Sequence, residues 1–329
     1  MIKNLPKTTL QRLTRAEMFD RFQINKPIDD IVNAAYKKAE EERWRGQLDN
    51  APHGNPWHTS FHASQFPGDD PMACPRKAMY TMMDLPPAEP FNRNARTIME
   101  VGKGIEIELV STFARAGILI SANPDEEIQT GFIYADAWLT GSVDCVILPT
   151  GTTLPIPIEI KTKYQSAIDE MKNGIRTPDV GHVFQIKTQL ALARHEQENG
   201  GLWSEHDLIT HGYIYYLSRD KPSDTAEFRI DFDKRFFDAG ISTLKQWKNW
   251  FIEDNLPSID PSKKHPMGWK WSYPPCQWCN WKKTCKLDFE QGVTQLSESI
   301  GISRASLVND EYDFDESRQR VLDRWNKKV

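Results

Sequence analysis

The chain has 329 residues, of which 39% are hydrophobic and 11% aromatic, enough for a sizeable core and too many for global disorder. Its net charge of −5 at pH 7 excludes a general basic coat for nucleic acid, so phosphate binding requires a local groove. No apolar run is long enough to span a bilayer, and Met1–Leu10 lack a signal-peptide pattern, so we expect a cytoplasmic protein with no membrane partner.

The spacing of apolar residues predicts helices in the first 60 residues. Leu10, Leu13 and Phe19 lie on one apolar stripe, and a second helical pattern, strongly charged towards its end, runs from Ile28 to Trp44. The charged face is typical of a solvated surface. We therefore expect residues 1–60 to form an accessory helical arm.

Residues 61–290 predict an α/β core. A helix is expected to open at Pro75 beside Cys74, and another over 96–116 contains Gly102 and Gly104. Each glycine costs about 1 kcal/mol in a helix, which suggests close approach of backbone or ligand. The order of helices and strands indicates a mixed central sheet flanked by helices. Further along we expect strands over 128–134 and 212–217, helices over 178–194 and 234–254, and a polar tail over 291–329 with a short helix at 316–327.

A hairpin is predicted between Thr140 and Tyr164. Residues 143–148 and 156–160 have strand composition, and Pro149-Thr150-Gly151-Thr152 is a turn signal. A hairpin symmetric about Gly151 and Thr152 pairs Asp144 directly with Glu159, and Lys161 then shares the face of Glu159. Two prolines at the start of the second strand cannot donate to a ladder, so this register is provisional.

Two opposed carboxylates repel each other, and a divalent cation such as Mg²⁺ removes that repulsion. The Lys161 side chain can then orient a water as the ammonium, or deprotonate it as the neutral amine, for attack on phosphorus. The alternative is an ordinary hairpin with a surface ion pair between Glu159 and Lys161. Spacing alone does not decide between the two.

Three of the five cysteines crowd into the pattern C-x2-C-x5-C: Cys276, Cys279 and Cys285. Cys74, beside a helix start, is the better candidate for a fourth ligand. Cys145 directly follows Asp144, so its side chain points to the opposite sheet face and is expected to be buried. Zinc and an iron–sulfur cluster both suit these ligands.

Five motifs in order resemble one family. They are Cys74 with Pro75-Arg76-Lys77, G-x-x-x-E ending at Glu106, G-x-x-D ending at Asp144, E-x-K at Glu159–Lys161 and the terminal cysteine pattern. Together they resemble the iron–sulfur branch of the PD-(D/E)xK nucleases, the RecB-like group that includes the CRISPR adaptation exonuclease and many phage exonucleases. The resemblance covers residues 64–286.

The resemblance implies a restriction-endonuclease-like core and a role for each matching residue. Asp144, Glu159 and the Ile160 carbonyl would bind Mg²⁺ or Mn²⁺, and Lys161 would act on the attacking water. Glu106, where many relatives have histidine, would be a further metal ligand. Gln185 matches the helix glutamine of the family, although the tyrosine that often follows four residues later is Gln189 here. A 4Fe-4S cluster would be held by Cys74, Cys276, Cys279 and Cys285.

The function expected from this resemblance is a metal-dependent DNA exonuclease acting in recombination, repair or processing. A local groove for DNA would combine basic residues with tryptophans as stacking platforms, unless the tryptophans pack around the cluster. One alternative is a non-catalytic, zinc-containing nucleic-acid-binding module; another is a nuclease subunit of a larger recombination or spacer-capture complex. The groove candidates are Arg76, Lys77, Lys163, Lys263, Lys264, Lys282 and Lys283, with Trp269, Trp271, Trp278 or Trp281.

Overall fold

The computed structural model describes residues 60–67, 73–83, 93–120, 130–255, 257, 276, 279, 281–297 and 314–326. The chain divides into two compact units, Met1–Arg45 and Gly46–Val329, and every described residue belongs to the second. The predicted helical arm therefore lies outside the described residues, apart from its last position.

The smaller sheet has three strands in the order β1-β3-β2. β1 (Phe61–His62) runs parallel to β3 (Leu139–Val143), whereas β2 (Thr130–Tyr134) pairs antiparallel with β3. Every residue of β3 is buried, which is expected for a central strand covered on both faces.

The larger sheet has four strands in the order β4-β5-β6-β7. β5 (Ile156–Lys163) pairs antiparallel with β4 (Cys145–Ile147) and parallel with β6 (His211–Ser218). β7 (Thr225–Asp231) closes the edge antiparallel to β6, and its alternating exposure identifies it as a half-solvated strand.

The prediction of one central mixed sheet is wrong in one respect: there are two mixed sheets. The stretch predicted as a single strand breaks at Asp144, the one residue between β3 and β4. Its side chain accepts a hydrogen bond from the backbone N–H of Ile160 at 2.7 Å. β3 and β4, on either side of this residue, belong to different sheets.

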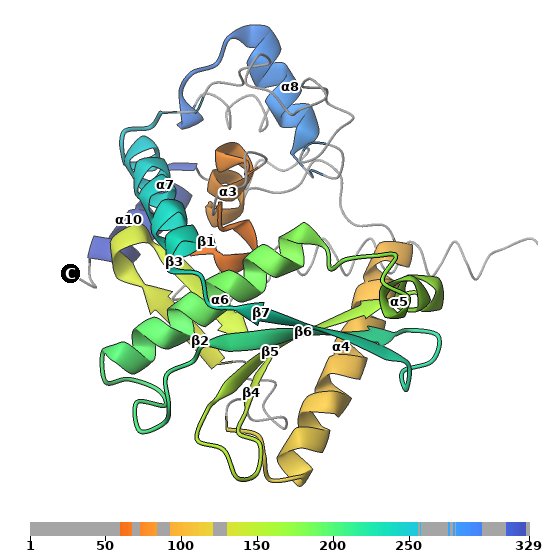
Figure 1. Cartoon of the computed structure of the whole chain (residues 1–329). Coiled ribbons are helices and arrows are strands. Elements are labelled where there is room, and N and C mark those ends of the chain that lie inside the picture. The colour runs from red at the N-terminus through yellow and green to blue at the C-terminus, as the bar shows by residue number, and fades with distance from the viewer. Residues whose placement is uncertain are drawn as a thin grey trace, which may run out of the picture. The chain divides into compact units, whose positions relative to one another are not determined.

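Helices flank both sheets (Figure 1). The expected helices at 75, 96–116, 178–194, 234–254 and 316–327 are present with shifted ends. α5 and α8, like β7, had not been predicted. The helices are α3 (Pro75–Met82), α4 (Arg93–Arg115), α5 (Gln165–Lys172), α6 (Val180–Glu198), α7 (Lys234–Ile252), α8 (Lys282–Gln291) and α10 (Phe314–Asn326), with short 3₁₀ turns η1 (Ala63–Gln65) and η3 (Ala135–Ala137).

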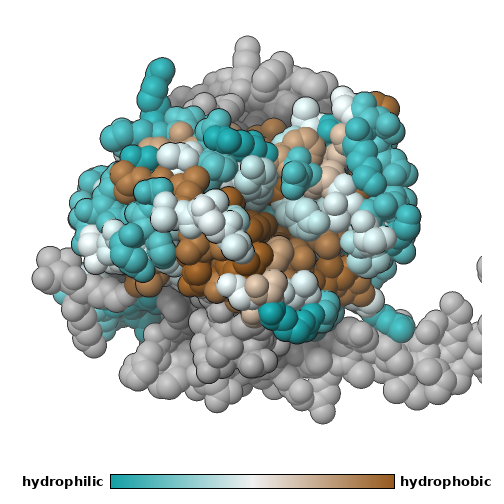
Figure 2. Space-filling view, turned by 60° about the horizontal axis from the view of Figure 1, so that its bottom comes forward, coloured by the Kyte–Doolittle hydropathy of each residue, from teal (hydrophilic) through white to brown (hydrophobic). Residues whose placement is uncertain are grey.

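The two faces of the larger sheet are covered by different helices. α4 packs through Val110 against Cys145, Ile158 and Ile160. On the other face, α6 packs through residues including Ile186 against the main core, which continues under α3 and α7. Figure 2, turned so that the bottom of Figure 1 faces the viewer, shows apolar residues gathered on that side with hydrophilic residues around them. Because α4 covers one face of the larger sheet and α6 the other, alternate residues of β5 face these two helices.

The two glycines of α4 differ. A Cβ at Gly102 would lie 3.2 Å from Thr162 Oγ1, so the predicted close approach exists there, between α4 and β5. A Cβ at Gly104 would meet nothing within 4 Å, so no close approach explains that glycine.

The C-terminal helix packs on the core. Trp325 is 2% exposed and stacks on Trp138, with ring centroids 5.9 Å apart and planes 13° apart. Val321 is also buried. Within the described part of the chain, no helix combines the length and the apolar character needed to cross a membrane.

Candidate active site

The predicted hairpin register is confirmed. Cys145 pairs with Ile158, Val146 with Pro157 and Ile147 with Ile156, so the proline inside β5 does not shift the ladder. Continuing the same register by one residue sets Asp144 opposite Glu159. The Pro149–Thr152 turn closes the hairpin, with Gly151 at φ 82°.

Asp144 lies buried where the two sheets meet. Burial raises its pKa well above the usual range, and the carboxylates of Glu159 and Glu106 raise it further. The Lys161 ammonium and the Ile160 N–H oppose that shift without cancelling it. Three acidic groups, from α4, the β3–β4 junction and β5, therefore act on one another electrostatically.

Glu159 is fully buried, and its Oε1 forms an ion pair with Lys161 Nζ. Burial alone would lower the pKa of Lys161, but the carboxylates of Glu159 and Asp144 outweigh that effect and raise it. The ion pair foreseen in the alternative interpretation of the hairpin thus exists. It is not a surface pair, because one partner has no exposed side-chain area.

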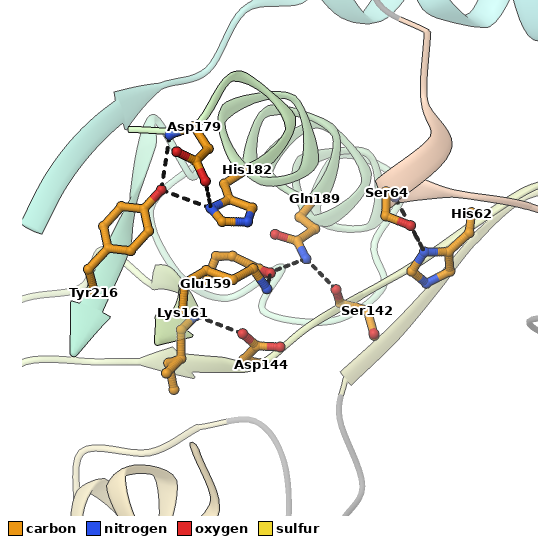
Figure 3. Close-up of polar contacts among 11 residues, drawn as sticks. His62, Ser64, Ser142, Asp144, Glu159, Lys161, Asp179, His182, Gln189 and Tyr216 are labelled. Carbon is orange, nitrogen blue, oxygen red and sulfur yellow. Dashed lines mark hydrogen bonds and ion pairs between the residues drawn. The ribbon is translucent and has the colours of Figure 1, made fainter. Parts of the chain in front are cut away.

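The glutamine that contacts this site is Gln189, one helical turn after the predicted Gln185 (Figure 3). Its Nε2 donates to Glu159 Oε2 and to the backbone carbonyl of Ser142, both at 2.6 Å. Both partners are acceptors, which fixes the orientation of the amide. The Oε1 atom of Gln189 is buried and has no hydrogen-bond partner among the described residues. The predicted Gln185 makes no side-chain hydrogen bond to another described residue.

We expect Gln189→Ala to reduce any activity of this site about 10- to 100-fold, because it removes a hydrogen bond to a buried carboxylate. Gln185→Ala, on the same helix and half-buried, is the matched control and should stay within about twofold of the wild type. Cleavage rates of the two variants, measured side by side, check this. Equal losses would contradict the assignment of the contact to Gln189.

Gly141, the first residue of G-x-x-D, explains how α6 comes so close. A Cβ there would lie 2.8 Å from Leu192 Cδ1 and 3.0 Å from the Ala63 side chain. The glycine therefore lets α6 approach β3, which brings Gln189 within reach of Glu159.

Four of the five cysteines influence one another electrostatically, and their role as ligands of one site stays a prediction. Burial raises the pKa of the thiols of Cys74, Cys276, Cys279 and Cys285, that of Cys276 to about 11. Cys74 and Cys279 add to this shift at Cys276 and Cys285, so the sulfur atoms lie within electrostatic range of one another. Cys145 is fully buried in the α4-facing cluster, as expected.

A buried polar contact joins the two ends of this cysteine region. Arg76 Nη1 pairs with Asp288 Oδ2 at 3.0 Å, and Tyr80 donates to the same oxygen at 2.8 Å. Arg76 Nε also donates to the Pro257 carbonyl at 2.7 Å. Arg76 follows Cys74 by two residues and Asp288 follows Cys285 by three, so this contact holds α3 and α8 together beside the thiols.

Two members of the predicted DNA groove have other roles. Arg76 is 4% exposed and satisfied by Asp288, so it does not reach a ligand at the surface. Trp281 is 7% exposed and packs against Tyr80, which agrees with the packing alternative. Lys163 pairs with Asp179, while Lys77 and Lys283 are exposed. Lys263, Lys264, Trp269, Trp271 and Trp278 lie outside the described residues.

No family model and no curated protein matches this chain. Its structure is similar to that of an alkaline exonuclease, LHK-Exo, from Laribacter hongkongensis, with a TM-score of 0.40 and 16% identity over 60% of this chain and 91% of that one. LHK-Exo in complex with dAMP gives a TM-score of 0.39 and 14% identity over 59% and 90% of the two chains. Both similarities are distant.

Within the described residues, no three His, Cys, Asp or Glu side chains form a group able to hold one metal ion. Asp144 and Glu159 are thus a pair, with Glu106 close enough to shift pKa values but not to complete such a group. A pair is compatible with Mg²⁺, which usually binds one or two carboxylates and keeps several waters. The Ile160 carbonyl as a ligand stays a prediction.

Asp144→Asn should stabilise the metal-free protein at alkaline pH. Because the folded pKa of Asp144 is raised, its contribution to stability is complete below the unfolded pKa and is lost as pH rises through the folded pKa. Asn keeps an acceptor for the Ile160 N–H without the charge. Melting temperatures in chelator between pH 5 and 9 should fall less for the variant, and added Mg²⁺ should stabilise only the wild type. If the melting temperatures of the wild type and the variant fell equally with pH, the charge of Asp144 would not be the cause of the loss of stability.

Proposed function

We propose that this protein is a metal-dependent nuclease that hydrolyses phosphodiester bonds in DNA, as an exonuclease. The observation that carries the proposal is the convergence of Asp144, Glu159, Lys161 and Gln189 at one buried point. A structural role explains such a group poorly, since burying like charges together is costly unless something compensates them.

The residues suit a divalent cation on chemical grounds. Asp144 and Glu159 provide hard oxygen ligands, and their repulsion is expressed in the raised pKa of Asp144. Gln189 Oε1 is a buried acceptor with no described partner, which water held at a cation site would satisfy. Bound by Asp144 and Glu159, Mg²⁺ or Mn²⁺ would offset the negative charge that develops on the phosphate.

The protein's own groups prepare the reaction. Gln189 fixes Glu159 by donating to Oε2, and Lys161 holds the other oxygen, so the carboxylate cannot rotate freely. The Ile160 N–H fixes Asp144 in the same way. Lys161 stays protonated at neutral pH, because its pKa is raised, and it would orient the attacking water and stabilise charge on phosphate oxygens.

We also propose that Cys74, Cys276, Cys279 and Cys285 hold a 4Fe-4S cluster. A tetrahedral zinc ion requires sulfur atoms about 3.8 Å apart, given Zn–S bonds of about 2.3 Å. The four thiols lie within electrostatic range of one another, which suits zinc and a cluster alike. A 4Fe-4S cluster, in which each cysteine binds a different iron, is the group that the resemblance implies for these four residues. Because ligation requires thiolates, it would overcome their raised pKa values.

One preparation, purified without oxygen, tests both parts. Iron and sulfide content decides between cluster and zinc, and end-labelled single- and double-stranded DNA with Mg²⁺ or Mn²⁺ reports cleavage. We expect labelled mononucleotides or short products that disappear in chelator. DNA binding without cleavage, together with zinc in place of iron, would instead support the non-catalytic binding module.

A further inference from the structure

His182 lies beside the acidic site but was not expected there. It is on α6, seven residues before Gln189, and residues seven apart share one face of a helix. Its contact Tyr216 pairs with Lys161 across β5 and β6. Figure 3 shows the His182 ring between Tyr216 and Gln189, on the side of β5 that carries Glu159 and Lys161.

The hydrogen bonds favour the tautomer of His182 in which Nε2 carries the proton. The backbone N–H of Asp179 lies 3.2 Å from the Tyr216 hydroxyl and can only donate, so the phenol oxygen accepts. In the arrangement that satisfies all three groups, the hydroxyl donates its own proton to His182 Nδ1, which lies 2.8 Å away. Nδ1 is then an acceptor, and the proton of the neutral imidazole is on Nε2.

His182 is neutral under ordinary conditions. Burial lowers its pKa to about 4, and the ammonium groups of Lys161 and Lys163 contribute in the same direction. Its side chain is 24% exposed, and Nε2 is not one of the buried unpartnered polar atoms. Among the described residues, the Nε2 atom of His182 has no hydrogen-bond partner. The site therefore holds a solvent-accessible N–H donor, with the ammonium groups of Lys161 and Lys163 and the Asp179 carboxylate nearby.

We propose that the Nε2–H of His182 donates to a phosphate oxygen of the bound DNA strand, beside Lys161, with Tyr216 holding the ring in the required tautomer. This inference rests on the proposed nuclease function. An anionic oxygen suits the position, because the donor is neutral and costs little to desolvate, and because the charges of Lys161 and Lys163 offset those of their carboxylate partners, Glu159 and Asp179.

The test compares four variants for DNA binding in Ca²⁺ and for cleavage in Mg²⁺. His182→Ala should raise both Kd and KM about 10- to 100-fold, the range for a hydrogen bond to a charged group. His182→Gln, which keeps an N–H near the Nε2 position, should recover part of that loss. Tyr216→Phe, which keeps the ring but frees the tautomer, should cost about threefold. His195→Ala, at the other end of α6, is the matched control and should bind and cleave like the wild type.

Oligonucleotides with one methylphosphonate at a time identify the contacted phosphate. At that position the substitution should weaken the wild type but leave His182→Ala unchanged, since the variant has already lost the contact. A wild type that cleaves while His182→Ala binds and cleaves equally well would overturn the inference and leave the nuclease function intact. Binding that depends on His182 without any cleavage would overturn the nuclease function and retain the phosphate contact. A wild type that neither binds nor cleaves would overturn both.

Discussion

Lys161→Ala is expected to lower DNA cleavage about 10²- to 10⁴-fold, the contribution typical of a positioned proton-transfer or orienting group. Lys161 is the one cation paired with the buried Glu159 in the described structure, and it lies on the same strand face. Its removal leaves both carboxylates and Gln189 in place, so metal-dependent stabilisation should persist.

The matched control is Lys163→Ala. Lys163 is the next residue on the same face of β5, but its ammonium pairs with Asp179 rather than with the buried carboxylates. We expect this variant to retain cleavage within about tenfold. Single-turnover rates on end-labelled DNA, with melting temperatures and iron content in parallel, separate catalysis from folding. Normal cleavage by Lys161→Ala would exclude its proposed role.

Asp288→Ala is expected to destabilise the protein by about 3–5 kcal/mol, the cost of leaving one member of a buried ion pair uncompensated. Arg76 is 4% exposed and Asp288 fully buried, and Tyr80 shares the same carboxylate oxygen. Because this contact joins the segments that carry Cys74 and Cys285, we also expect the variant to lose bound iron.

Two controls sharpen this result. Asp288→Asn keeps an acceptor for Tyr80 without the charge, so it should fall between the alanine variant and the wild type. Glu290→Ala, exposed on the same helix, should stay within about 0.5 kcal/mol of the wild type. Urea unfolding and iron content measure both effects. Unchanged stability in Asp288→Ala would show that the pair does not hold the two segments together.

The hairpin and its register were predictable because local chemistry sets them. A glycine-containing turn fixes the loop, and alternating isoleucines fix the face of β5, so Asp144 could be placed opposite Glu159 before the fold was known. The burial of Cys145 followed from the same alternation. The choice of Cys74 as the fourth ligand came from its place beside a helix start, and the family resemblance then implied the same residue.

Other features depend on tertiary contacts that no local pattern encodes. The choice between Gln185 and Gln189 is set by the rotation of α6 against β3, and only the packing around Gly141 and Leu192 determines it. His182 could be placed near the acidic residues only from the structure, in which β6 brings its hydrogen-bond partner Tyr216 beside Lys161. The division into two sheets at Asp144 was likewise visible only in the fold.

The position of Asp144 between β3 and β4 links ion preference to the mechanics of the whole core. One side of this residue is anchored in the three-stranded sheet and the other in the four-stranded sheet that carries Glu159. Any substitution that lets one sheet shift relative to the other changes the distance between the Asp144 and Glu159 carboxylates, even when the substituted residue is far from both. Mg²⁺ tolerates little departure from octahedral geometry, so such variants should lose magnesium-supported turnover before they lose their fold.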